Sequence, residues 1–143
     1  SETKTRKPVI DRLAIGLRFD NNVVVETMNK ACGMALFWTK ETQILEVYTT
    51  AFTIEAKIED TDSHVVWWFI GVYASCDHMI MNEQWRVLSN RKRLWGSRYM
   101  IAGNFNDILS NEEKWGGVVR EERSFRDFQD FIDQNSLIDV GFE

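Results

Sequence analysis

The stretch Gly103-Asn104-Phe105-Asn106 holds the residues in this sequence that are best suited to chemistry. It ends an apolar run, and polar groups that follow a strand are often the binding or catalytic groups of a protein. In an extended backbone Asn104 and Asn106 project to one side and Phe105 to the other. The two carboxamides could then reach one phosphate or one water together, and Gly103 permits close backbone approach. Asparagine is also a preferred turn residue, so a simple turn is the alternative.

Two other segments place polar residues at the ends of predicted strands. Residues 1–4 read Ser-Glu-Thr-Lys, and residues 71–74 read Gly-Val-Tyr-Ala. They contribute a carboxylate, Glu2, and a phenol, Tyr73. These segments and the one at 103–106 are therefore the candidates for a functional site.

The elements that must position these residues are mainly strands. Continuous apolar character at 34–38 is typical of a strand covered on both faces. Residues 52–59 alternate with period two, which predicts a strand with one face in water. Residues 65–73 are β-branched and aromatic throughout and are the best candidate for a central strand. Shorter strands are predicted at Val23–Val25, at Tyr99–Gly103 and, as the start of a further strand, at Leu137–Phe142.

Helices are predicted between these strands. Over Met81–Trp95 a stripe of large side chains recurs every three or four residues, with basic residues between, as on an amphipathic helix. A second helix is predicted after Ser124, which could cap it; its apolar stripe, more typical of core packing than of a ligand site, is Phe125, Phe128, Phe131 and Ile132. Helices that fall between strands favour an α/β layered sandwich.

Size and charge narrow the function classes. The chain has 143 residues, of which 44% are hydrophobic, so a single globular domain spanning 1–143 is expected. Its formal net charge of -5 argues against a simple electrostatic nucleic-acid binder. A metal ion held between protein and phosphate would supply positive charge locally, so a metal-dependent enzyme is not excluded. No apolar stretch approaches the roughly 20 residues that span a bilayer, and no membrane partner is expected.

The two cysteines, Cys32 and Cys76, lack the paired spacing of structural metal sites. Reduced cysteines in an intracellular protein are the expected state. A zinc site that combines them with His64 and His78 is the alternative.

The order and spacing of several motifs resemble the endonuclease/exonuclease/phosphatase superfamily, which is deoxyribonuclease-I-like. The similarity is greatest to the endonuclease domain of plant LINE-type non-LTR retrotransposons. Near the start, the family's ETK matches Ser-Glu-Thr-Lys at 1–4, and its GGLALLW matches Cys-Gly-Met-Ala-Leu-Phe-Trp at 32–38. In the middle, its GFYG with a distant Trp matches Gly-Val-Tyr at 71–73 with Trp85. Towards the end, its GDFN matches Gly-Asn-Phe-Asn at 103–106, and its EKxGGxxR matches Glu-Lys-Trp-Gly-Gly at 113–117 with Arg120.

This resemblance implies a two-sheet β-sandwich flanked by helices, here incomplete at both ends. It also implies Mg²⁺-dependent hydrolysis of phosphodiesters, DNA as partner, a nuclear location and no organic cofactor. By position, Glu2 matches the Mg²⁺-binding carboxylate, and a single Glu is reasonable because Mg²⁺ often keeps only one or two protein carboxylates. Tyr73 and Asn106 match residues that contact the phosphate or orient the attacking water. Arg120 is a candidate phosphate contact.

Asn104 occupies the position of the family's GDFN aspartate, which prepares a water to attack phosphorus. A carboxamide oxygen accepts a hydrogen bond but cannot take the proton. Losing a general base typically costs about 10²- to 10⁴-fold in rate. The expected function is therefore that of a remnant endonuclease domain, inactive or nearly so.

Further departures from the family point the same way. The C-terminal Ser-Asp-His-type motif has no counterpart, neither His64 nor His78 lies in a matching context, and the loop after Tyr73 lacks the arginine usual in plant relatives. A decayed or truncated copy is therefore expected. The alternatives are a non-catalytic binding module, faintly supported by six tryptophans, and a phosphoesterase of the same fold that acts on small molecules.

Overall fold

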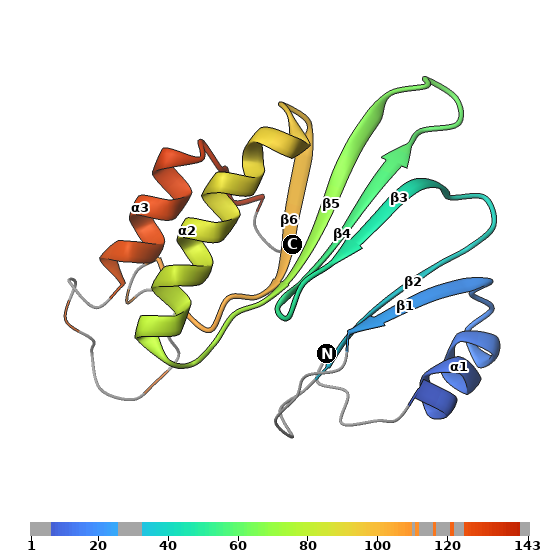
Figure 1. Cartoon of the computed structure of the whole chain (residues 1–143), viewed down its shortest axis with the longest axis horizontal. Helices are drawn as coiled ribbons and strands as arrows, with labels where there is room; N and C mark the ends of the chain where they lie inside the picture. Colours follow the sequence, from blue (N-terminus) through green and yellow to red (C-terminus); the bar gives the residue numbers. More distant parts are fainter. Residues whose placement is uncertain are drawn as a thin grey trace. The chain divides into compact units, whose positions relative to one another are not determined.

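The computed structural model describes residues 7–25, 33–109, 111, 116, 121 and 125–140, and for residues 7–9 it describes only the backbone. The chain forms two compact units (Figure 1). The first comprises residues 1–73 and 97–104, and the second comprises residues 74–96 and 105–143. Each unit is described below by itself.

The first unit is built from two β-sheets and a helix. Its elements are α1 (Lys7–Gly16), β1 (Asn21–Val25), β2 (Met34–Trp38), β3 (Gln43–Thr49), β4 (Thr53–Glu59), β5 (Val66–Tyr73) and β6 (Tyr99–Asn104). β1 and β2 pair antiparallel as one sheet, and the other sheet has the order β3-β4-β5-β6. β2 packs against β4 and β5, and α1 packs against β1. The predicted α/β fold with two packed sheets is confirmed.

β5 is a central strand, as its β-branched and aromatic composition predicted. It pairs antiparallel with β4 on one side and parallel with β6 on the other. Parallel neighbours need a crossover connection, and the chain makes it through the helix that follows β5. The carboxyl ends of β5 and β6 consequently lie at the same edge of the sheet, where Tyr73 is the register partner of Asn104.

The turn between β4 and β5 is organised by Asp60. Its carboxylate accepts hydrogen bonds from the Ser63 backbone N at 2.7 Å and from the Ser63 hydroxyl at 2.8 Å. These bonds, the backbone one first, lower the pKa of Asp60 below its usual range. A turn fixed in this way sets the register of the hairpin, and the register determines where Tyr73 lies at the other end of β5.

The expected water-facing side of β4 is partly buried. Thr53 and Glu55 are each 0% exposed, so the prediction of a wet face is wrong at these two positions. A chain of polar contacts satisfies them: the hydroxyls of Thr50 and Thr53 are 2.7 Å apart, and Thr53 Oγ1 donates to Glu55 Oε1 at 3.3 Å. Buried polar groups are tolerated when they are hydrogen-bonded in this way.

The second unit contains the helices α2 (His78–Trp95) and α3 (Arg126–Gln134), which pack against each other. α2 begins three residues before the predicted start because the Asp77 carboxylate caps it, accepting from the Met79 and Ile80 backbone N at 2.9 and 3.2 Å. Its predicted stripe is buried at Trp85, Leu88 and Trp95. The helix prediction is confirmed.

An aromatic cluster forms the core of this unit. The Trp85 ring centroid lies 5.0 Å from that of Phe131, 5.2 Å from that of Phe128 and 6.1 Å from that of Phe105. Phe125, Phe128 and Phe131 are each at most 5% exposed. The stripe on α3 is thus core packing, as its spacing favoured.

Some sequence-based boundaries differ from the structure. Residues 137–140, the described part of the strand predicted at 137–142, are not a strand, because the Leu137 N–H is used to close α3 by bonding Ile132 O at 3.0 Å. The predicted capping residue Ser124 lies outside the described residues, and Phe125 precedes α3 without a side-chain cap. The structure also contains α1 and β3, for which the sequence shows no clear periodic pattern.

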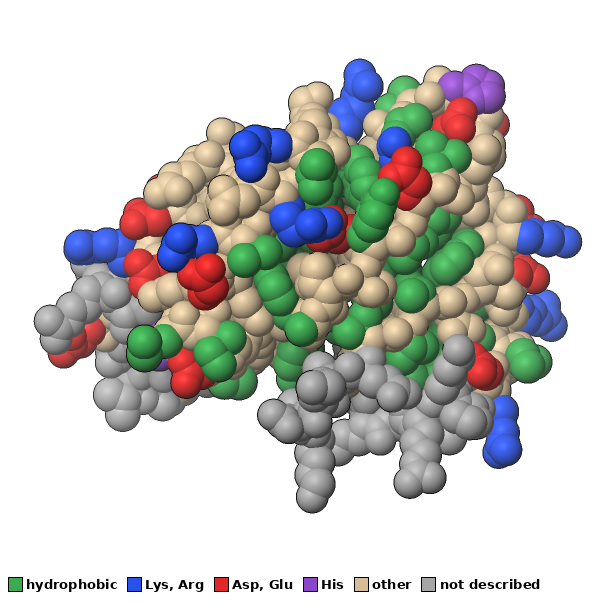
Figure 2. Space-filling view, viewed as in Figure 1, with side chains coloured by type: hydrophobic (Ala, Val, Ile, Leu, Met, Phe, Trp, Pro, Cys, Tyr) green, Lys and Arg blue, Asp and Glu red, His purple; other side chains and the backbone are tan. Residues whose placement is uncertain are grey.

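The exposure of apolar side chains bears on the alternative functions. Hydrophobic side chains reach the surface over the sheets of the first unit (Figure 2). Leu45, Tyr48 and Met100 of this unit are 43%, 50% and 48% exposed. Every tryptophan that the structure describes is buried or half-buried. The described tryptophans therefore form no fully exposed aromatic face. None of the described helices combines the length and the apolar character needed to cross a lipid bilayer.

Candidate active site

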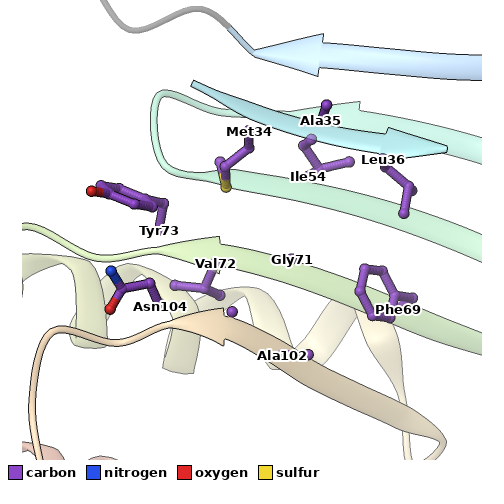
Figure 3. Close-up of a pocket in the computed structure, with 11 residues that line it drawn as sticks. Met34, Ala35, Leu36, Ile54, Phe69, Gly71, Val72, Tyr73, Ala102 and Asn104 are labelled. Carbon is purple, nitrogen blue, oxygen red and sulfur yellow. The ribbon is translucent and has the colours of Figure 1, made fainter. Parts of the chain in front are cut away.

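Tyr73 and Asn104 lie together at the end of the four-stranded sheet (Figure 3). They are register partners on the parallel strands β5 and β6, and paired residues project to the same face of a sheet. Tyr73 is half-buried and Asn104 is exposed. A phenol hydroxyl and a carboxamide placed side by side can each donate to, or accept from, one phosphate or one water.

Both residues line a cavity of about 460 Å³ within the first unit. The floor is formed by the register partners Gly71 and Ala102. Gly71 has no side chain and Ala102 has only a methyl group, so the space above them stays open. Apolar residues from both sheets complete the wall: Met34, Ala35, Leu36, Ile54, Phe69 and Val72. Tyr73 and Asn104 are therefore the polar groups at one end of a mainly apolar hollow (Figure 3). The sequence did not predict that Ala102 lines a cavity, because Ala102 belongs to no recognised motif.

Gly103 has a structural reason to be glycine. Its φ is +145°, and a Cβ there would lie 1.9 Å from Val72 O and 2.9 Å from Val72 C. No other residue fits without moving the backbone of β5. The close backbone approach inferred from the sequence is thus an approach between two strands.

The chain turns immediately after Asn104. β6 ends at Asn104, and Asn106 has a φ of +51°, so Asn104 and Asn106 do not share the face of one strand as the extended-backbone interpretation assumed. Asn106 belongs to the second unit, where its Nδ2 donates to Ala74 O at 2.6 Å. A contact between Asn106 and a phosphate stays a prediction. Phe105 packs into the aromatic cluster, 5.4 Å from Phe128 between ring centroids.

The residues of the stretch 103–106 thus have different structural roles. Gly103 allows two strands to approach, Phe105 fills the core of the second unit, and Asn106 bonds a backbone carbonyl. Asn104 and Gly103 are both exposed and both line the cavity, and of the two only Asn104 carries a side chain with polar groups. It is the position in this stretch whose side chain is best placed to meet a ligand.

The remaining predicted site residues, Glu2 and Arg120, lie outside the described residues, as does Cys32 of the alternative zinc site. Among the residues that are described, no three His, Cys, Asp or Glu side chains gather to hold a metal. Mg²⁺ prefers oxygen ligands that include a carboxylate. The described cavity lining offers a phenol and a carboxamide but no carboxylate, so these residues alone do not fit Mg²⁺.

Comparisons with known proteins establish the fold. No family model matches the chain, and no curated protein matches it. The human Nocturnin catalytic domain with bound sulfate anion is 15% identical, with a TM-score of 0.58 over 92% of this chain and 53% of that chain. Truncated TDP2 from Caenorhabditis elegans is 11% identical, with a TM-score of 0.52 over 84% of this chain and 51% of that chain.

The two-sheet α/β arrangement matches the endonuclease/exonuclease/phosphatase fold of these solved structures. At these identities the likeness establishes the fold and not the reaction. The chain spans about half the length of the solved structures that it matches. What the endonuclease/exonuclease/phosphatase fold contributes here is the pair of facing sheets, with Tyr73 and Asn104 at the ends of two adjacent strands.

Proposed function

We propose that this chain derives from a Mg²⁺-dependent DNA endonuclease domain of a plant LINE-type retroelement and that it does not cleave DNA, because Asn104 replaces the residue that activates the attacking water. In this proposal Tyr73 contacts the scissile phosphate. Arg120 is a further phosphate contact.

The observation that carries the proposal is the pairing of Tyr73 with Asn104 at the mouth of the cavity. Tyr73 and Asn104 are the last residues of β5 and β6, which end within the motifs at 71–73 and 103–106. The fold that contains these strands is shared with Nocturnin and TDP2. The other members of the 103–106 stretch have structural roles. A loss of chemistry at Asn104 alone is therefore compatible with an intact fold.

Hydrolysis of a phosphodiester needs a water that can lose a proton as it attacks. The carboxamide oxygen of Asn104 can accept a hydrogen bond from such a water and hold it near the phosphate, but it cannot receive the proton. Tyr73 can donate its hydroxyl hydrogen to a phosphate oxygen. We assign the Mg²⁺-binding role to Glu2, because its side chain would supply the carboxylate ligand that the described lining lacks. The bound cation would offset the charge of the phosphate.

Incubation of the purified chain with supercoiled plasmid and Mg²⁺ tests the proposed inactivity. We expect no nicking beyond that of a protein-free control, since the proton acceptor is missing. Robust nicking that EDTA stops and that Glu2→Ala abolishes would contradict inactivity while supporting the metal assignment. Nicking that survives both treatments would point to a contaminating nuclease, and repurification to constant specific activity separates that case.

A further inference from the structure

The peptide group that joins Ala74 to Ser75 is held on both sides by carboxamide side chains. Asn106 Nδ2 donates to Ala74 O at 2.6 Å, and the Ser75 backbone N donates to Gln84 Oε1 at 2.8 Å. All four residues belong to the second unit. We call this arrangement, made of Asn106, Gln84 and the peptide between Ala74 and Ser75, the peptide clamp.

The geometry of a peptide group makes the clamp effective. In a trans peptide the C=O and the N–H point in opposite directions, and no described peptide bond is cis. The two carboxamides therefore bond it from opposite sides, Gln84 from α2 and Asn106 from the turn after β6. Rotation of a peptide plane between its flanking Cα atoms is a low-energy motion of a loop, and bonds at both ends oppose it.

The neighbouring segment is fixed in the same manner. Ser75 Oγ accepts from the Asp77 backbone N at 3.0 Å, and the Asp77 carboxylate accepts from the first turn of α2. Ala74 is 0% exposed, so its carbonyl lies where an unpaired polar group is costly. The φ of +51° at Asn106 is one that asparagine tolerates better than most residues.

We propose that Asn106 and Gln84 are positioning residues: by fixing the Ala74–Ser75 peptide group, one residue beyond Tyr73, they restrain the backbone that carries the Tyr73 side chain. The Tyr73 backbone N is already held by Phe52 O at 3.0 Å, and the clamp adds a restraint on the C-terminal side, at the peptide after Ala74. This inference rests on the proposed function, because it takes Tyr73 as the phosphate contact. It gives Asn106 a role in the free protein that precedes any contact with a substrate.

Hydrogen exchange at the Ser75 amide, measured by NMR on the full chain, tests the clamp. We expect Gln84→Ala to speed exchange about ten-fold or more, because an amide that loses its acceptor is no longer protected, and Gln84→Glu to preserve protection. Asn106→Gly removes the carboxamide without strain at positive φ and should also speed exchange at Ser75. The Met79 amide, which bonds the Asp77 side chain, is the internal control. Equal effects on both amides would mean general destabilisation and would overturn the clamp.

Asn106→Asp adds a pH-dependent check. The introduced carboxylate lacks a donor for Ala74 O, so Ser75 protection should fall at pH 7. It should recover below about pH 4, where a protonated carboxyl can donate again. Protection that does not depend on pH in this variant, or that is unchanged at pH 7, would contradict the role of the Asn106 donor.

The Tyr73 ring provides the second measurement. The chain has three tyrosines, so ring-labelled tyrosine gives few NMR signals, and Tyr48 and Tyr99 serve as controls. We expect Asn106→Gly and Gln84→Ala to shift or broaden the Tyr73 signal alone. An unchanged Tyr73 signal would overturn the positioning role even if Ser75 exchange responds. These measurements require no catalysis, so their failure is distinguishable from failure of the proposed function, which is measured by DNA cleavage.

Discussion

Asn104→Asp is expected to raise DNA cleavage by about 10²- to 10⁴-fold, the typical contribution of a general base. Because the chain spans about half the length of the solved structures that it matches, the comparison is made in a chimera completed with the C-terminal half of an active relative. Asn104 is exposed at the end of β6, so a carboxylate there remains solvated and costs little stability. Nicking of supercoiled plasmid with Mg²⁺ measures the gain.

Asn106→Asp in the same chimera is the matched control. It makes the same chemical change two residues away but removes the donor that bonds Ala74 O, so no gain in cleavage is expected. Adding Tyr73→Phe to Asn104→Asp should remove much of the restored activity, because the hydroxyl that we propose contacts the phosphate is lost. If Asn104→Asp gives no gain in a folded chimera, Asn104 does not occupy the position of the base.

Gly103→Ala is expected to lower the free energy of unfolding by about 3 to 5 kcal/mol, which combines steric overlap with backbone strain. The added Cβ would lie 1.9 Å from Val72 O at a φ of +145°. The obstacle is the backbone of a central strand, which cannot rotate away as a side chain could. Urea unfolding followed by circular dichroism measures the change.

Two other glycines separate the contribution of steric overlap from that of backbone strain. At Gly96 φ is +71° but a Cβ would meet nothing within 4 Å, so Gly96→Ala should cost about 1 to 2 kcal/mol from backbone strain alone. At Gly16 there is neither a positive φ nor a neighbour within 4 Å, so Gly16→Ala should be neutral or stabilise by up to about 1 kcal/mol. A Gly103→Ala variant no less stable than Gly96→Ala would show that β5 and β6 can separate at this point.

Much of the fold follows from patterns in the sequence, and the exceptions have physical causes. The run at 66–73 could be recognised as a central strand because β-branched and aromatic residues pack well on a sheet that has a buried face. β3 was missed because a register shift between Ile44 and Glu46 breaks its alternation. α1 was missed because apolar residues lie on both its buried side, at Ile10 and Ala14, and its exposed side, at Leu13 and Ile15, which hides the helical period.

The candidate site was predictable in its residue types but not in its connections. Tyr73 and Asn104 could be selected because each ends a predicted strand, and the structure brings them together. The bond from Asn106 to Ala74 spans 32 residues, and the partnership of Gln84 with Ser75 depends on how the loop enters α2. Local patterns carry no information on such pairings, because they arise only when distant segments pack.

The different structural roles of residues 103–106 predict which substitutions would accumulate in such a chain if selection acted only on its folding. Substitutions at Gly103, Phe105 and Asn106 would be removed, because each harms the fold by steric overlap, by an emptied core or by an unpaired carbonyl. Position 104, exposed at the strand end, would be nearly silent to such selection. An aspartate at this position would be the first residue of the motif to be replaced. Gly103, Phe105 and Asn106 would be retained long after cleavage activity had been lost.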